Sequence, residues 1–312
     1  MSVELPSAAP PAAPAPSKSR VFLRRLASSV ILWSVVLFAL FSGNKLLSDF
    51  VFLAFMLVLA ATGLLEFYGL VQKSGLVCFA GWGVLGGVLL MAGTFFHLQG
   101  FLGITGTPAR VNDFEMSFLI LFVLGLCLRQ FFSKELRSAI PAVATTLLGL
   151  MYVPWLLNFI QKINFFFAET GARDAGTFYV LYFIVVTKFS DIGAYCVGSL
   201  IGRHKMIPRI SPGKTWEGFG GAIVVSSGAS LAFAHFAGDK LAGMTTGHAL
   251  ILGILLSVAA VVGDLIESIF KREAGVKDSG RFFPGIGGIL DLLDSLLFNA
   301  PLMYLYLRHV LT

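Results

Sequence analysis

The stretch GHALILGILLSVAAVVGDLIESIF, residues 247–270, decides the fold. A helix that spans a bilayer needs about 20 mostly apolar residues, and this run exceeds that length. Its charged residues are Asp264 and Glu267, both close to its C-terminal end. The run therefore predicts a membrane-spanning helix that carries carboxylates near one surface.

Other runs of similar character occur along the chain. Only 13% of its 312 residues are charged, 56% are hydrophobic and the mean hydropathy is +0.84, whereas a soluble domain has roughly 25% charged residues. We predict an all-α fold, a polytopic integral membrane helical bundle with about nine transmembrane helices. The runs lie at about 26–42, 50–71, 76–96, 114–128, 139–160, 177–198, 216–236, 247–270 and 290–307.

The distribution of Lys and Arg predicts the topology. With the N-terminus in the cytosol, 16 of the 23 Lys and Arg residues lie on the cytosolic side and six on the other. This positive-inside bias makes loops 199–215 and 271–289 cytosolic. The net charge of +6 thus favours membrane topology and anionic lipid over nucleic acid as its explanation.

The composition also divides the chain into regions. Residues 1–20 form a Pro/Ala-rich arm that we expect to be disordered, because it cannot bury a core. Residues 21–175 hold the first transmembrane helices, and residues 176–312 the catalytic transmembrane region. The cysteines fall inside apolar runs, without the spacing of a disulfide framework or a metal motif.

Loop 271–289 and the helices beside it carry most of the polar signal. Asp264, Glu267, Ser268 and Lys271 follow one another at i, i+3, i+4 and i+7, so they share one face of a helix. On the next helix, three polar residues share a face in the same way: Asp291, Asp294 and Ser295.

Two helices thus present carboxylates toward a loop rich in Lys, Arg and Gly. Carboxylates suit Mg²⁺, and Lys and Arg suit phosphate oxygens. The glycines of this loop let backbone amides approach an anion. The alternative is that a cytosolic loop is simply charged, with its acids paired to Lys. Asp264 and Asp291 weigh against that, because an unpaired carboxylate beside apolar sequence is costly.

Loop 199–215 supports the same interpretation less strongly. Asp191 lies within the preceding helix, and the glycines at 193, 198 and 202 permit close helix packing. We expect Ser211-Pro212-Gly213 to form a turn, with Lys214 and Thr215 at the start of the next helix, where anions bind readily. The alternative is that these residues serve packing and anchoring alone.

The motifs as a whole resemble the phosphatidate cytidylyltransferase family. Its signature is similar to S-x-x-K-R-x-x-x-x-K-D-x-G-x-x-x-P-G-H-G-G-I-x-D-R-x-D, and the upstream blocks SDIGAY, IGRHK and ISPGKTWEG resemble it too. The resemblance is clear over residues 182–297. The signature is matched at Ser268, Lys271, Arg272, Lys277, Asp278, Gly280, Pro284, Gly285, Gly287, Gly288, Ile289, Asp291 and Asp294.

The resemblance implies that CTP and phosphatidate react to give CDP-diacylglycerol and pyrophosphate, at the cytosolic face of a multi-pass protein of the bacterial inner membrane. It implies Mg²⁺, with K⁺ and a homodimer as further expectations. The expected catalytic residues are Asp264, Asp291, Lys271, Arg272, Lys277 and Asp278. The expected substrate-binding residues are Ser268, Lys214, Asp191, Gly287 and Gly288. The expected metal ligands are Asp264, Asp291 and Asp294.

Two departures from the signature leave an alternative open. Ile286 stands at the position of the family's His, and Leu292 at that of its Arg. A weakened or inactive paralogue that binds lipid or a partner is therefore the second interpretation. A transporter would be expected to place its charges near the bilayer midplane. A CDP-alcohol phosphatidyltransferase would show a D-x-x-D-G-x-x-A-R motif, which is absent from the sequence.

Overall fold

The computed structural model describes residues 18–101, 108–133, 138–168, 171–280, 282 and 287–311, with side chains from Ala27 and, after the first gap, from Val111. Their helices, with η marking π or 3₁₀ segments, are α1 (Lys18–Phe41), α2 (Lys45–Lys73), α3 (Ala80–Leu98), α4 (Pro108–Phe131), α5 (Ala139–Leu150), η1 (Met151–Trp155), α6 (Leu156–Asn164), α7 (Arg173–Ile201), α8 (Trp216–Ala237), η2 (Gly238–Lys240), α9 (Thr246–Glu273), α10 (Ile289–Tyr306) and η3 (Leu307–Leu311).

The predicted helical membrane bundle is confirmed. In the described residues, eight helices are long and apolar enough to cross a membrane, and α1 adds the apolar segment Ala27–Phe41. One of the eight spans is composite, because Pro154 interrupts it with the π turn η1 between α5 and α6. Proline lacks the N–H that an α-helix needs at this position, which explains the wider turn.

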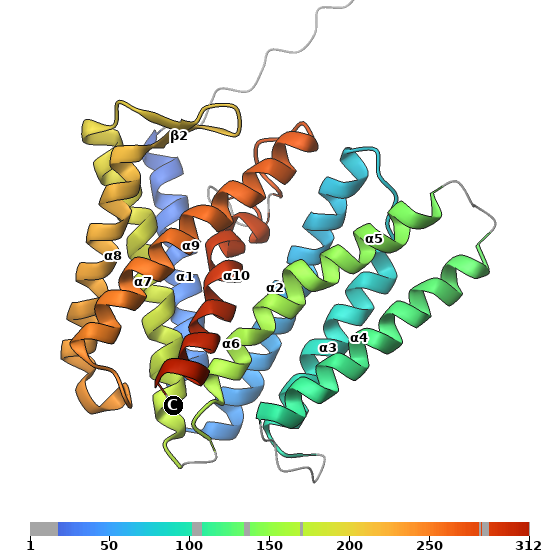
Figure 1. The fold of residues 1–312 in the computed structure, drawn as a ribbon, viewed down its shortest axis with the longest axis horizontal. Coiled ribbons are helices and arrows are strands. Elements are labelled where there is room, and N and C mark those ends of the chain that lie inside the picture. The colour runs from blue at the N-terminus through green and yellow to red at the C-terminus, as the bar shows by residue number, and fades with distance from the viewer. Residues whose placement is uncertain are drawn as a thin grey trace, which may run out of the picture.

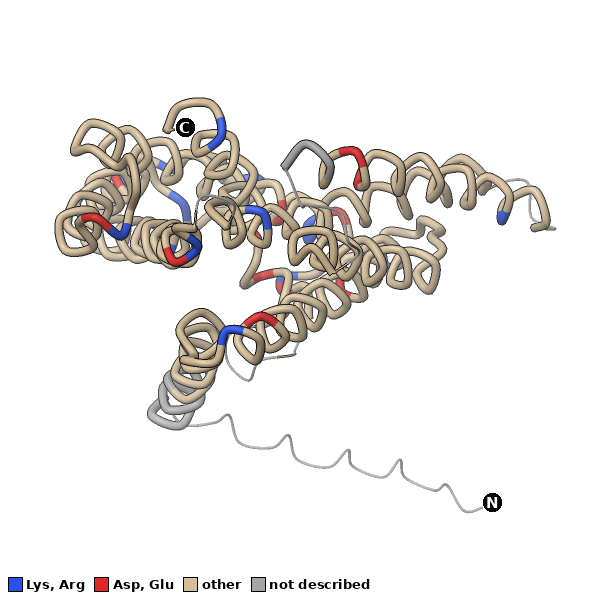
Figure 2. The backbone as a smooth tube through the Cα atoms, turned by 90° about the horizontal axis from the view of Figure 1, so that it is seen from below, with Lys and Arg blue, Asp and Glu red and all other residues tan. Residues whose placement is uncertain are grey.

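The helices run up and down, so that successive connections alternate between two ends of the bundle (Figure 1). The connections α7–α8 and α9–α10 lie together at the upper end in that view, and the C-terminus lies at the lower end. Charged residues occur in short stretches of the backbone, and most of each helix carries none (Figure 2). Residues 1–17 of the predicted arm 1–20 lie outside the described residues, and residues 18–20 belong to α1.

Helices α7, α8, α9 and α10 form the densest part of the fold. Gly193 of α7 faces Gly221 of α8 so closely that a Cβ on Gly193 would lie 2.6 Å from the Gly221 carbonyl oxygen. A Cβ on Gly198 would lie 3.4 Å from the Cα of Gly218. The prediction that glycines allow close packing in this region is therefore confirmed for these two contacts.

A small hairpin occupies loop 199–215. Strands β1 (Lys205–Ile207) and β2 (Ser211–Thr215) pair antiparallel. The expectation of a turn at residues 211–213 is wrong, because those residues belong to β2 and the turn comes before them, at residues 208–210. The strand ends directly at α8, where Thr215 Oγ1 accepts a hydrogen bond from Gly218 N at 3.1 Å. This cap fixes Lys214 beside the C-terminal part of α7 and beside Asp264 of α9.

Candidate functional site

Three carboxylates meet where α9 packs against α10. Asp264 and Glu267 of α9 and Asp294 of α10 each offer an oxygen within 4.8 Å of the others. The spacing i, i+3 aligns the two acids of α9 on one face. Gly263 lets α10 approach, since a Cβ there would lie 2.6 Å from the Asp294 carbonyl oxygen. We call Asp264, Glu267 and Asp294 the acidic cluster.

The acidic cluster fits a divalent cation. Glu267 is fully buried and Asp294 is 8% exposed. Within the described part of the chain, neither Glu267 oxygen accepts a hydrogen bond of good geometry. Lys271 forms an ion pair with Glu267, but the three carboxylates of the acidic cluster still outweigh this one positive charge at a site that is shielded from solvent. Three hard oxygen donors are the ligand set that Mg²⁺ or a similar cation prefers.

The structure brings together two of the three expected metal ligands, Asp264 and Asp294. The third, Asp291, is engaged elsewhere: its Oδ1 lies 2.7 Å from Lys271 Nζ, and its Oδ2 accepts bonds from Ser279 N at 3.0 Å and Gly288 N at 2.8 Å. Asp291 thus caps α10 and holds the preceding connection. Glu267 occupies the position in the acidic cluster that was predicted for Asp291. The sequence could have indicated this, because Glu267 shares one face of α9 with Asp264.

Glu66 of α2 supports the candidate site, although the sequence analysis does not identify it as a site residue. Its carboxylate accepts hydrogen bonds from Ile289 N at 3.0 Å, Leu290 N at 2.8 Å and Ser279 Oγ at 3.0 Å. The first amides of a helix lack partners inside the helix, and a carboxylate satisfies them best. Glu66 therefore anchors the N-terminus of α10, and with it the acidic cluster, to the first half of the chain.

We expect Glu66→Ala to destabilise the folded protein by about 1–3 kcal/mol, because the backbone amides of Ile289 and Leu290 lose their acceptor. Thermal unfolding in detergent measures the effect. Glu273→Ala is the matched control, since Glu273 is exposed at the end of α9. An equal change in both variants would contradict the anchoring role.

A cavity of about 500 Å³ opens beside the acidic cluster and is lined by α7, α8, α9, α10 and the hairpin. We call it the polar cavity. Lys214 reaches into it, with Nζ 2.9 Å from Asp264 Oδ2 and 3.0 Å from the Val261 carbonyl oxygen. Asp191, Lys188 and the hairpin residues Ser211 and Gly213 line the same space. Cations and carboxylates thus face one volume large enough for a polyanionic ligand.

Other predicted residues lie around the polar cavity. Ser268 Oγ donates to Asp264 Oδ1 at 3.4 Å, and Arg272 Nε donates to the Ile210 carbonyl oxygen at 3.1 Å, which ties α9 to the hairpin. Lys277 and Asp278 are exposed after α9 and do not line the polar cavity.

The glycine-rich segment before α10 is described only at its end. Gly287 has a φ of +120°, a conformation that favours glycine, and Gly288 is the N-cap of α10. Ile286 lies outside the described residues. Leu292 does not line the polar cavity; its side chain lines a separate apolar cavity.

Comparison with known proteins covers most of the chain. The sequence model of the family described as "Cytidylyltransferase family" matches residues 23–310. The uncharacterized protein YnbB of Escherichia coli is 37% identical over 164 residues, which are 53% of this chain and 51% of YnbB. The phosphatidate cytidylyltransferase of Staphylococcus saprophyticus is 37% identical over 206 residues, 64% of this chain and 72% of that enzyme. The Staphylococcus aureus enzyme of the same name is 38% identical over 192 residues, 62% of this chain and 66% of that enzyme.

Proposed function

The chain belongs to the cytidylyltransferase family, and we propose that it transfers the cytidylyl group of CTP to phosphatidate, which yields CDP-diacylglycerol and pyrophosphate. The observation that carries the proposal is the polar cavity: carboxylates and lysines face one volume at the end of membrane-spanning helices. Such a site admits a water-soluble polyanion from one side and a lipid from the other. The named staphylococcal relatives favour phosphatidate as the lipid.

The proposed reaction requires alignment and charge neutralisation more than proton transfer. A phosphate oxygen of phosphatidate forms a bond to the α-phosphorus of CTP, and the bond from that phosphorus to the bridging oxygen of pyrophosphate breaks. Phosphomonoesters have a second pKa near 6, so the attacking oxygen is largely ionised at neutral pH. The protein must hold two polyanions in line and offset the charge of the leaving group.

The residues of the polar cavity suit these tasks. Lys214, held between Asp264 and the start of α8, is placed to bind phosphate oxygens of the nucleotide. Asp264, Glu267 and Asp294 would hold Mg²⁺, which supplies charge neutralisation and orients phosphate oxygens when bound. Lys271 forms ion pairs with Glu267 and Asp291, and these contacts hold the acidic cluster and the start of α10 in place. We assign Lys271 and Asp291 a positioning role rather than contact with the reacting atoms.

Purified protein incubated with labelled CTP, phosphatidate and Mg²⁺ tests the proposal. We expect CDP-diacylglycerol and pyrophosphate in equal amounts, and no product when Mg²⁺ is chelated. A folded protein that binds phosphatidate without turnover would favour the alternative of an inactive paralogue.

We further propose that the polar cavity faces the cytosol, in agreement with the Lys and Arg distribution. Single cysteines at Lys277 and Lys240, in a background without Cys78, Cys127 and Cys196, test this topology. In intact cells an impermeant thiol reagent should label position 240 and spare position 277. Labelling at position 277 from outside would contradict both the topology and access to cytosolic CTP.

A further inference from the structure

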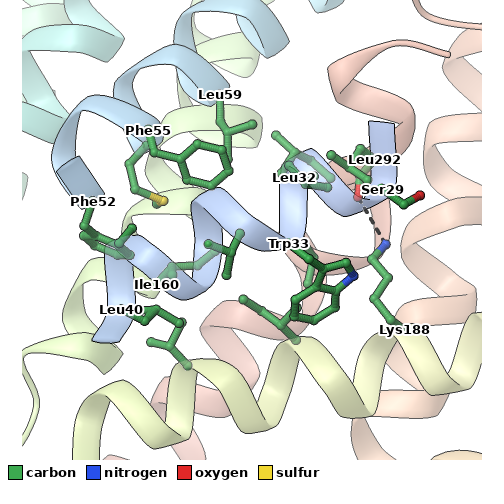
Figure 3. A pocket seen from close by; sticks show the side chains of 17 residues that line it. Ser29, Leu32, Trp33, Leu40, Phe52, Phe55, Leu59, Ile160, Lys188 and Leu292 are labelled. Atoms are coloured by element: carbon green, nitrogen blue, oxygen red, sulfur yellow. Dashed lines mark hydrogen bonds between the residues drawn. The ribbon is translucent and has the colours of Figure 1, made fainter. Parts of the chain in front are cut away.

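Lys188 of α7 lines two cavities at once. One is the polar cavity beside the acidic cluster. The other is an apolar cavity of about 260 Å³ between α1, α2, α7 and α10 (Figure 3). The lysine therefore stands where a charged compartment borders a hydrocarbon compartment.

The apolar cavity has the character of a binding site for hydrocarbon. Among the described residues, its lining is apolar apart from Ser29 and Lys188. Trp33 of α1, Phe55 of α2 and Leu292 of α10 line it (Figure 3). Ile184 of α7 lines it as well. Helix α1 packs mainly against α2, so it covers the cavity without filling the space next to α7 and α10.

The ammonium group of Lys188 is only loosely held in the structure. Its Nζ lies 3.4 Å from Asp191 Oδ2 and 3.3 Å from the Leu292 carbonyl oxygen. Charge-assisted hydrogen bonds are usually about 2.7–2.9 Å long, so both contacts are weak. A lysine within a membrane span is costly unless it meets a stronger anionic partner or serves a ligand.

We propose that the apolar cavity holds one hydrocarbon chain of a lipid with a phosphomonoester headgroup, and that Lys188 binds its phosphate at the border with the polar cavity. The inference rests on the proposed function and adds where the lipid lies and which cation selects its headgroup. A phosphate at Lys188 would enter the polar cavity that also contains Asp264 and Asp294. A headgroup without a dianionic phosphate would lose this contact.

Trp33 provides a direct readout, because it lines the apolar cavity. Phosphatidate with a brominated acyl chain should quench its fluorescence saturably in detergent, without CTP. The difference in quenching between the wild type and Trp33→Phe gives the contribution of Trp33, apart from that of the other three tryptophans. Lys188→Met should weaken the binding by roughly tenfold or more, the effect of losing a hydrogen bond to a charged group, whereas Lys188→Arg should retain it.

Two further variants separate the two halves of the inference. Ile184→Phe should reduce quenching because the larger ring fills the apolar cavity. Lys188→Met combined with Leu292→Arg should recover binding, since the new cation starts from a residue next to the lost one.

Two results would overturn the inference. One is unchanged affinity in a Lys188→Met variant that unfolds at the wild-type temperature. The other is equal saturable quenching by brominated phosphatidylcholine, which would show that the cavity accepts any hydrocarbon chain. Saturable, Lys188-dependent quenching in a protein without turnover would instead sustain the lipid site and refute the proposed reaction.

Discussion

Asp264→Asn is expected to lower turnover with CTP and phosphatidate by more than about 100-fold while the protein still inserts and purifies normally. Groups that only support a metal ligand account for roughly 10- to 100-fold, so a ligand itself should exceed that range. Asp264 is also the partner of Lys214 in the polar cavity, so both the cation and the phosphate contacts would suffer. Initial rates at saturating Mg²⁺ measure the effect.

The acidic cluster should behave as a unit. Asp294→Asn should resemble Asp264→Asn, and the double variant should be no worse than either single one, because residues acting together are non-additive. Asp239→Asn is the matched control, since Asp239 is exposed in η2 at the other end of the bundle. Near-normal rates in either single variant would refute the assignment of the acidic cluster.

Lys271→Met should cause the largest loss of stability of any single substitution considered for this protein. Lys271 Nζ forms ion pairs with Glu267 and Asp291, and the side chains of the three residues are 11%, 0% and 13% exposed. Removing one partner of a buried pair leaves an uncompensated charge and costs about 3–5 kcal/mol. Thermal unfolding in detergent should show a markedly lower midpoint than the wild type.

Two companion variants make this result interpretable. Lys73→Met removes an exposed lysine at the end of α2 and should leave the unfolding midpoint nearly unchanged. Adding Glu267→Gln to Lys271→Met should restore part of the loss, because it neutralises the stranded carboxylate. A wild-type midpoint in Lys271→Met would show that water or another cation compensates these acids.

The sequence predicts the helices well because the bilayer imposes a length and an apolar composition on each span. It also predicts that carboxylates of two helices meet beside loop 271–289, because helical spacing places Asp264 on one face of α9 and both Asp291 and Asp294 on one face of α10. Local spacing alone could not separate Asp291 from Asp294. Both lie within the first two turns of α10, and only packing against α9 decides which carboxylate faces Glu267.

The residues that sequence reasoning missed depend on contacts between distant parts of the chain. Glu66 is more than 200 residues from the amides that it caps. Lys188 has no special local pattern, and its position between two cavities arises from how α1 and α10 pack beside α7. The hairpin turn was misplaced because Pro and Gly at 212 and 213 favour turns but are also tolerated in a short, exposed strand.

The cap that Glu66 provides also constrains how the protein is made. A chain is synthesised from its N-terminus, so α2 enters the membrane long before α10 emerges from the ribosome. Until then the Glu66 carboxylate has none of the three hydrogen-bond partners that it contacts in the finished fold. The end of the bundle that holds the acidic cluster is thus completed by its last helix. Chains truncated before Ile289 should therefore insert into the membrane without a complete acidic cluster and be degraded faster than the full chain.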